Sequence, residues 1–306
     1  MINKKNEISL PMLFSLLWRE KIIIAIITLI VTVLSAIYLY FQPNIYRSQV
    51  LLSPSNVEGS GMSAMASQLG GLASIAGINL DSGDNSTQVT MATLESRLFI
   101  TSFVKKHDLL IPLLAGGGFN RETGEVEIDK EIYNDGVWVL NKINRNPNDW
   151  DIYYQFSDIL TVANNPKSGL VDISIDFVSP SLAKEWLELF IEDINIWMKE
   201  KAIEDAKNNI SYLNEKLTEI TMVDMQSVFY GLIEEQTKKL MLAEVQEQYA
   251  FKIIDPPLES KNIYKPKRKI VLAISFLLGG SLAIFIVLIK YYLVNSYRVY
   301  RESDND

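Results

Sequence analysis

The sequence predicts an α+β membrane protein, in which two transmembrane helices flank a mixed α/β domain with a long projecting helix. Two uncharged apolar runs, 22–41 and 270–289, lie near the two ends of the 306-residue chain. Each run has about 20 residues, which matches the hydrocarbon core of a bilayer at a rise of about 1.5 Å per residue. The segment between the runs combines strand-like alternation with a long helical stripe.

Both runs are interpreted as membrane spans. The first is longer than the apolar region of a signal peptide, and Gln42-Pro43-Asn44 follows it in place of a small-residue cleavage site. A buried helix of this length in a soluble protein normally keeps polar residues on one face. The predicted organisation is a tail (1–21), a span (22–41), an α/β domain (42–269), a second span (270–289) and a second tail (290–306).

The orientation follows from basic residues beside the first span. Four precede it and only Arg47 follows closely; the four are Lys4, Lys5, Arg19 and Lys21. This bias places both tails in the cytoplasm and the domain outside, in the periplasm. The second span carries the opposite bias, with Lys265, Lys267, Arg268 and Lys269 on its loop side. We take the orientation from the first span, because the first span usually decides the orientation of the whole chain. The basic cluster before the second span is then expected to contact lipid headgroups.

Composition narrows the function classes. Asp plus Glu number 37 against 29 Lys plus Arg, and an acidic surface argues against nucleic-acid binding. With no cysteine and one histidine, His107, most zinc and iron sites are excluded and no cofactor is expected. We interpret His107 as a surface or helix-end residue. No hydrolase, metalloprotease or phosphate-loop motif occurs, although a separated carboxylate pair of the glycosidase kind stays open.

The first part of the outer domain reads as a strand followed by helical segments. Residues 46–52 alternate as a strand does, and 88–110 predict one helix. The Gly-, Ala- and Ser-rich segment 59–83 has two interpretations, a flexible loop with a short helix or a surface for close subunit contact. Gly116-Gly117-Gly118 and Thr123-Gly124 predict turns, because the triple glycine lacks the lysine of a phosphate-binding loop.

A small antiparallel sheet is predicted in the middle of the chain. Three strands are expected, at 150–156, 159–163 and 171–177, and the first alternates Trp150, Ile152, Tyr154 and Phe156 with polar residues. A helix then begins, capped by Ser179 or Ser181. Its first apolar stripe consists of Leu187, Phe190, Ile191, Ile194 and Trp197.

The same helix continues with a heptad-like stripe formed by Ile203, Ala206, Ile210, Leu213, Leu217 and Ile220. A helix over 181–220 would be about 60 Å long, too long for a small domain to cover. A second helix is expected over 224–249, the two long helices together covering about 181–249, with Val228, Leu232, Leu240 and Val245 inward. The pair forms an intramolecular hairpin, packs between subunits, or does both. A returning strand follows at 251–254.

The segment before the second span is rich in proline. Pro256, Pro257 and Pro266 stiffen it and keep it extended. Within the span, Gly279 and Ala283 form a small-xxx-small pair that lets helices approach closely in lipid.

These two ends resemble the polysaccharide co-polymerases, the chain-length-determinant or Wzz family, over the whole chain. The front match is Ile8-Ser9-Leu10, Leu16-Leu17-Trp18-Arg19, Pro43 and Tyr46-Arg47-Ser48. The back match is Pro256, Pro257, Pro266-Lys267-Arg268 and Gly279-Gly280. Lys265 stands where the family often has serine. The two ends together carry the resemblance, and either one alone would carry little.

The resemblance implies a homo-oligomeric ring in a Gram-negative inner membrane. It implies a non-enzymatic regulator of modal polysaccharide length that acts with a separate membrane polymerase and contacts the growing lipid-linked chain. Because the sequence ends at Asp306 without a kinase region, it resembles the kinase-free type that serves lipopolysaccharide O-antigen.

Two rival functions stay open at this stage. One is an export adaptor or outward-facing sensor, which needs a partner with an output domain. The other is an anchored carbohydrate-active enzyme, which needs a carboxylate pair in a cleft. Modal length, subunit number and the polymer's identity are not encoded in any recognisable pattern.

Overall fold

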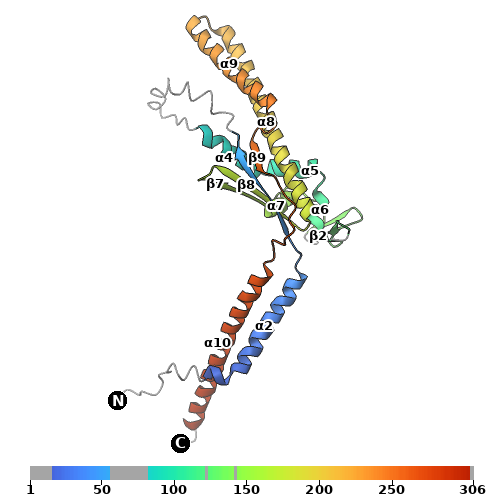
Figure 1. Cartoon of the computed structure of the whole chain (residues 1–306), viewed down its shortest axis with the longest axis vertical. Helices are drawn as coiled ribbons and strands as arrows, with labels where there is room; N and C mark the ends of the chain where they lie inside the picture. Colours follow the sequence, from blue (N-terminus) through green and yellow to red (C-terminus); the bar gives the residue numbers. More distant parts are fainter. Residues whose placement is uncertain (1–15, 56–81, 121–122, 141–142, 304–306) are drawn as a thin grey trace, which may run out of the picture. The chain divides into compact units, whose positions relative to one another are not determined.

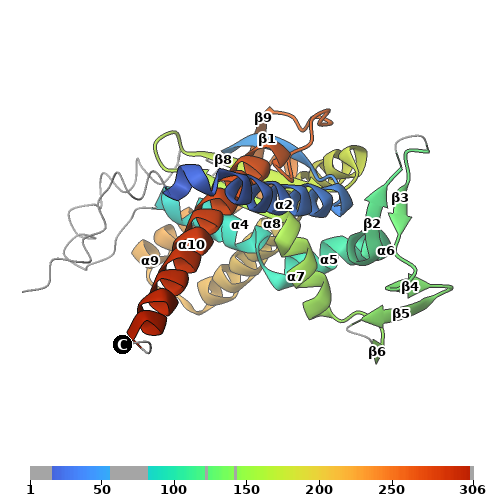
Figure 2. The same cartoon turned by 90° about the horizontal axis from the view of Figure 1, so that it is seen from below.

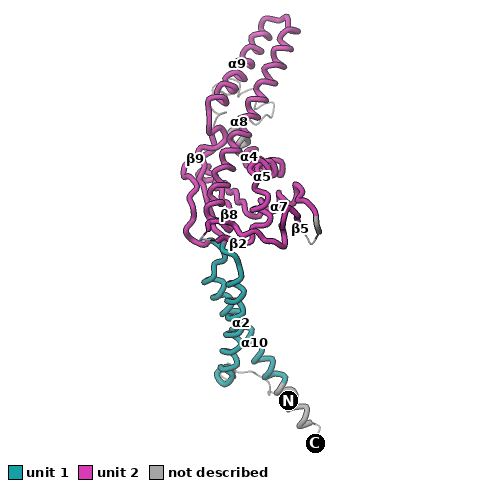
Figure 3. The backbone as a smooth tube through the Cα atoms, turned by 90° about the vertical axis from the view of Figure 1, so that its right-hand side faces the viewer, with its two compact units in different colours: residues 1–44, 264–306 teal, residues 45–263 magenta. Residues whose placement is uncertain are grey.

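The structure is a computed structural model that describes residues 16–55, 82–120, 123–140 and 143–303 (Figure 1). It divides into two compact units, coloured separately in Figure 3. The first unit contains residues 1–44 and 264–306, and the second contains residues 45–263. Residues 59–81 of the predicted small-residue segment lie outside the described residues, so its two interpretations stay open.

The first unit is a pair of long apolar helices, α2 (Lys21–Phe41) and α10 (Arg268–Ser303), which pack against each other. Both are long and apolar enough to cross a membrane, over Lys21–Phe41 and Arg268–Leu293. Most of their apolar side chains face outward; Leu29 is 64% exposed and Leu277 is 69% exposed. Such a surface is unfavourable in water and favourable in lipid. Helix α10 continues to Ser303, so most of the predicted second tail is helical.

The second unit is built on a four-stranded antiparallel sheet with the order β7-β8-β1-β9. Its strands are β1 (Tyr46–Pro54), β7 (Leu160–Asn165), β8 (Leu170–Phe177) and β9 (Phe251–Asp255). The predicted alternation along β1 is confirmed, because Tyr46, Ser48, Val50 and Leu52 are buried. Strand β1 pairs with β8 on one side and β9 on the other, so the returning strand lies beside the first.

The core lies between this sheet and three helices, α5 (Arg97–Lys106), α7 (Asp149–Ile159) and α8. From α8 (Pro180–Glu219) it takes the predicted stripe, with Leu187, Phe190 and Ile194 fully buried. Ser179 is the N-cap, and its hydroxyl accepts a hydrogen bond from the backbone N–H of Leu182 at 3.4 Å. The helix length of 40 residues agrees with the prediction.

The predicted strand at 150–156 is wrong, because these residues form helix α7 (Asp149–Ile159). Asn148 and Asp151 make a capping box, in which each side chain accepts a hydrogen bond from the other residue's backbone N–H. Ile152 and Phe156 are one helical turn apart and share the buried face. The apparent alternation was therefore two pairs of residues spaced by four.

The single helix predicted over 88–110 is divided. Helix α4 (Ser82–Leu94) ends before Ser96, whose hydroxyl caps α5 (Arg97–Lys106), and α6 (Leu110–Ala115) follows. His107 is the C-cap of α5, and its Nε2 lies 3.0 Å from Asp193 Oδ2. The helix-end interpretation of His107 is thus confirmed.

The turn predicted at the triple glycine is also wrong, because these residues begin a strand. Strand β2 (Gly116–Phe119) pairs with β3 (Val126–Ile128), and a Cβ at Gly116 would lie 2.3 Å from the carbonyl oxygen of Pro112. Three further short strands, β4 (Tyr133–Asn134), β5 (Val137–Leu140) and β6 (Ile143–Asn144), form a meander. Figure 2 shows these strands grouped beside α6 at the edge of the unit.

Candidate functional site

The second half of α8 and α9 (Val223–Val245) form an antiparallel helical hairpin that extends beyond the sheet (Figure 1). Ala206 is only 3% exposed, and the other predicted stripe residues are half-buried on the same side. That side is where α9 packs, so an intramolecular hairpin uses this stripe. The six stripe residues are Ile203, Ala206, Ile210, Leu213, Leu217 and Ile220.

The predicted inward face of α9 is largely wrong. Val228 is 56% exposed and Val245 is 82% exposed, whereas Leu240 is half-buried. The least exposed positions are instead spaced by three and four: Gln226, Phe229, Ile233, Gln236, Leu240 and Ala243. The side of α9 that α8 leaves uncovered also exposes large apolar residues, as does the N-cap Met222; those on the helix are Val223, Met225, Val228, Leu232, Met241, Leu242 and Val245.

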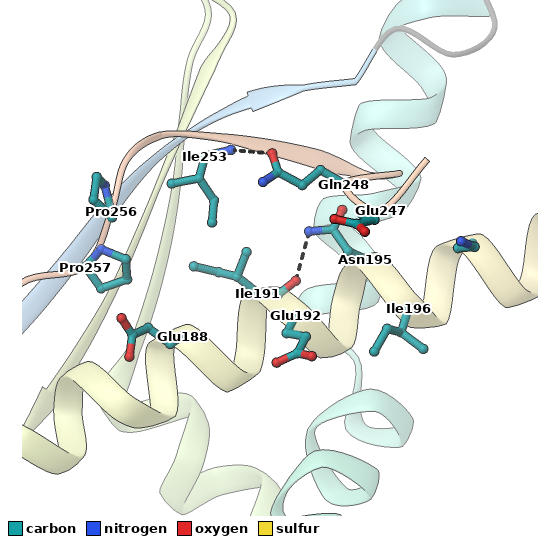
Figure 4. A pocket seen from close by; sticks show the side chains of 11 residues that line it. Glu188, Ile191, Glu192, Asn195, Ile196, Glu247, Gln248, Ile253, Pro256 and Pro257 are labelled. Carbon is teal, nitrogen blue, oxygen red and sulfur yellow. Dashed lines mark hydrogen bonds between the residues drawn. The ribbon is translucent and has the colours of Figure 1, made fainter. Parts of the chain in front are cut away.

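A cavity of about 590 Å³ lies where the first half of α8 passes β9 and the proline segment (Figure 4). Its volume is in the range of small-ligand sites. Pro256 and Pro257 form one wall, and Glu188 and Glu192 project from α8. The other lining residues are Ile191, Asn195, Ile196, Lys199, Glu247, Gln248 and Ile253.

Asn195 joins α8 to the strand that carries the proline wall. Its side-chain oxygen accepts hydrogen bonds from the backbone N–H groups of Ala250 (2.8 Å) and Phe251 (3.0 Å). Its amide nitrogen donates to the carbonyl of Ile191 at 3.0 Å. The side chain is 5% exposed, so these bonds satisfy groups that water reaches poorly.

Lys199 and Gln248 also have structural partners. Lys199 Nζ donates to the carbonyls of Glu244 (3.0 Å) and Gln246 (3.2 Å) at the C-terminus of α9, where a cation is favourable. Gln248 accepts a hydrogen bond from the backbone N–H of Ile253 at 3.2 Å. Glu188 forms an ion pair with Lys184 at 3.1 Å. Glu192 and Glu247 are thus the carboxylates best placed to meet a ligand. Such a wall can bind hydroxyl or cationic groups.

The cavity brings together residues that no local motif connects. The predicted motif residues Pro256 and Pro257 lie in it, but Glu188 and Glu192 were missed because acidic residues on a helix usually face solvent. Among the described residues, no cluster of three or more His, Cys, Asp or Glu side chains is arranged to hold a metal ion.

The other motif residues belong to the first unit. Pro266 and Lys267 immediately precede α10, and Lys267 Nζ lies 5.9 Å from the ring centroid of Tyr264. Arg268 donates a hydrogen bond to the side-chain oxygen of Asn44 at 2.9 Å. The proline segment is therefore shared between the two units.

Gly279 lies at a close contact between α10 and α2. A Cβ at this position would lie 3.1 Å from Cβ of Val31, whereas a Cβ at Gly280 would lie 3.9 Å from its nearest neighbour, Oγ1 of Thr28. Ala283 is fully buried, and the hydroxyls of Ser35 and Ser275 are 2.7 Å apart. The small-residue face thus packs against α2 of the same chain.

A group of exposed aromatic residues on α7 was also missed. Trp150 and Tyr154 are 52% and 61% exposed, and their rings stack. The strand interpretation placed them on a sheet. The signal that could have found them is Asn148 three residues before Asp151, which is typical of a helix start.

Comparisons with known proteins agree with the sequence motifs. Residues 6–107 match the family model described as chain length determinant protein, Wzz. No curated protein matches the chain.

Two solved structures are similar at low identity. One, a full-length bacterial polysaccharide co-polymerase, is 15% identical with a TM-score of 0.39, over 95% of this chain and 99% of the other. A fragment of WzzB, the polysaccharide co-polymerase of Salmonella Typhimurium, is 12% identical with a TM-score of 0.30, over 72% of this chain and 100% of the fragment. The family model supports the resemblance predicted from the front of the sequence, since residues 6–107 are similar to the chain length determinant family, and it does not extend to the motif residues between Pro256 and Gly280.

Proposed function

We propose that the chain regulates the length of a polysaccharide, and that a separate membrane polymerase makes the glycosidic bonds. The observation that carries the proposal is the family match over 6–107, which includes the first apolar helix and the first strand of the sheet. Two apolar helices long enough to span a bilayer are consistent with work at a membrane. We further propose that the polymer is lipopolysaccharide O-antigen, as the resemblance to the kinase-free type of the family implies.

The arrangement of surfaces supports a binding role. The uncovered side of α9 offers an apolar surface for another protein, such as a neighbouring subunit or the polymerase. The cavity beside Pro256 and Pro257 offers acidic and apolar groups in one place. Surfaces of this kind can influence when a growing chain is released without taking part in bond formation.

Deleting the gene tests this function. We expect surface polysaccharide to persist with a broad, random length distribution, in place of a band of preferred length on a gel. A plasmid copy should restore the preferred length. A deletion strain with an unchanged length distribution would reject the proposed function.

The proposal includes a topology, with both termini in the cytoplasm of a Gram-negative bacterium and residues 42–269 in the periplasm. Because the chain has no cysteine, single cysteines can report on it directly. A cysteine in place of the exposed Glu131 should react with a membrane-impermeant thiol reagent once the outer membrane is permeabilised. A cysteine in place of Asp304 should react only after inner-membrane lysis, and the reverse pattern would contradict the topology.

The proposal also includes assembly into closed rings. The small-residue face of α10 is occupied by α2, so the uncovered side of α9 is the better candidate for subunit contact. Light scattering of the detergent-solubilised protein should give a mass several times that of one chain. A monomer in every mild detergent tested would count against rings.

A further inference from the structure

Helix α7 presents a stack of aromatic rings on the surface of the second unit. The rings of Trp150 and Tyr154, one helical turn apart, have centroids 5.6 Å apart and an interplanar angle of 25°. Tyr153 meets Trp150 edge-on at 6.0 Å, with an angle of 80°. Although a large core is available nearby, Trp150 stays 52% exposed and Tyr154 stays 61% exposed. Two large rings exposed together indicate a surface with a use.

Charged side chains of α5 and α7 lie beside this stack. The guanidinium carbon of Arg97 lies 5.1 Å from the centroid of the Trp150 ring, a cation–π contact. Asp149 forms ion pairs with Lys105 at 2.6 Å and Arg97 at 3.7 Å. The hydrogen bond from Lys105 holds the pKa of Asp149 below its ordinary value. The capping box at Asn148 fixes the start of the helix that carries both rings.

We call Arg97, Lys105, Asp149, Trp150 and Tyr154 the aromatic patch. It combines flat ring faces with two cationic donors and one anionic acceptor at their edge. A pyranose ring has the matching chemistry, since one face carries C–H groups and the rim carries hydroxyls. The partial positive charge on those C–H groups is attracted to the negative face of an aromatic ring, and the hydroxyls can bond to carboxylate, ammonium and guanidinium groups.

We propose that the aromatic patch binds a sugar unit of the polysaccharide whose length the chain regulates. The identity of the ligand class rests on the proposed function; the site itself rests on the stack and its charged rim. Trp, Tyr and Arg are also enriched at protein interfaces, but Lys and Asp are depleted there, so Lys105 and Asp149 at the edge of the stack favour a hydroxyl-rich ligand over a protein partner. The pre-formed stack lowers the conformational entropy lost on binding, which suits weak contacts repeated along a polymer.

The test uses the full-length protein in detergent and calorimetric titration with polysaccharide. The polysaccharide is released from the producing cells by mild acid, which removes the lipid, and dextran serves as an unrelated polymer. Tyr154→Ala should weaken binding about tenfold or more, because the stacking face is lost. Tyr154→Phe keeps the ring and should bind as the unchanged protein does. Tyr212→Ala is the matched control, since Tyr212 is also 61% exposed but lies on α8, away from the patch.

The outcomes separate this site from the proposed function. If Tyr154→Ala binds polysaccharide as tightly as the unchanged protein, or if the unchanged protein does not bind it, the site is rejected. If Tyr154→Ala lowers the assembled mass by light scattering with no loss of sugar binding, the patch is a subunit contact and the proposal is again overturned. The proposed function fails by a different result, an unchanged length distribution after gene deletion.

Discussion

Replacing Gly279 by leucine should force the two membrane helices apart. Even a Cβ at this position would lie 3.1 Å from Cβ of Val31 and 3.4 Å from Cα of Thr28, and leucine adds three more carbon atoms to it. Overpacking of this kind costs about 1–3 kcal/mol and is relieved by moving the helices. Ser35→Cys combined with Ser275→Cys supplies the measurement, because the two serine oxygens are 2.7 Å apart, one turn from the glycine.

The cysteine pair should form a disulfide readily on mild oxidation, and the yield should fall several-fold when Gly279→Leu is added. Gly280→Ala is the matched control, since a Cβ there meets nothing closer than 3.9 Å and should leave the yield unchanged. In cells, Gly279→Leu should shift the polysaccharide length distribution at a normal protein level. Equal disulfide yields in all three backgrounds would show that the glycine does not set the helix separation.

Replacing Asn195 by alanine should destabilise the second unit strongly. The substitution removes the acceptor for the backbone N–H groups of Ala250 and Phe251, and Phe251 is fully buried. Leaving such groups without partners costs about 1–3 kcal/mol each. We therefore expect a loss of about 2–5 kcal/mol, which corresponds to a fall in Tm of about 5 °C or more for a domain of this size.

Tryptophan fluorescence during heating of the full-length protein in detergent measures this change, because Trp186 lies on α8 and is buried in the core. The matched control is Asn209→Ala on the same helix, where the amide makes one exposed contact with Gln236 at 3.4 Å. That variant should melt within about 1 °C of the unchanged protein, as surface changes usually do. If both variants melt alike, Asn195 does not hold α8 to β9 as described.

The sequence was sufficient to predict an element where its residues matched only one pattern. The apolar spans, the alternation along β1 and the first stripe of α8 each matched a single periodicity, and the structure has all three. The segment 150–156 matched two periodicities. Ile152 and Phe156 are spaced by four, as on one face of a helix, and they also belong to the alternating row that predicts a strand. The capping box at Asn148 decided between them.

The cavity and the face of α9 depend on contacts distant in the sequence. Glu188 and Pro257 line the same cavity only because β9 returns to pair with β1. On α9, hydrophobicity favoured Val228 and Leu232 as inward residues, yet the side that packs on α8 contains Gln226 and Gln236. In a single chain a two-helix hairpin can cover only one side of α9, so Val228 and Leu232 on the other side are exposed.

The most direct test of the central claim, regulation of chain length without bond formation, compares synthesis with length in one experiment. Cells with the gene deleted and cells with it restored are given a radiolabelled sugar, and both the rate of incorporation into polymer and the length distribution are measured. The account predicts similar incorporation in both strains and a preferred length only where the gene is present. Loss of incorporation in the deletion strain would contradict it, because the chain would then be needed to make the polymer.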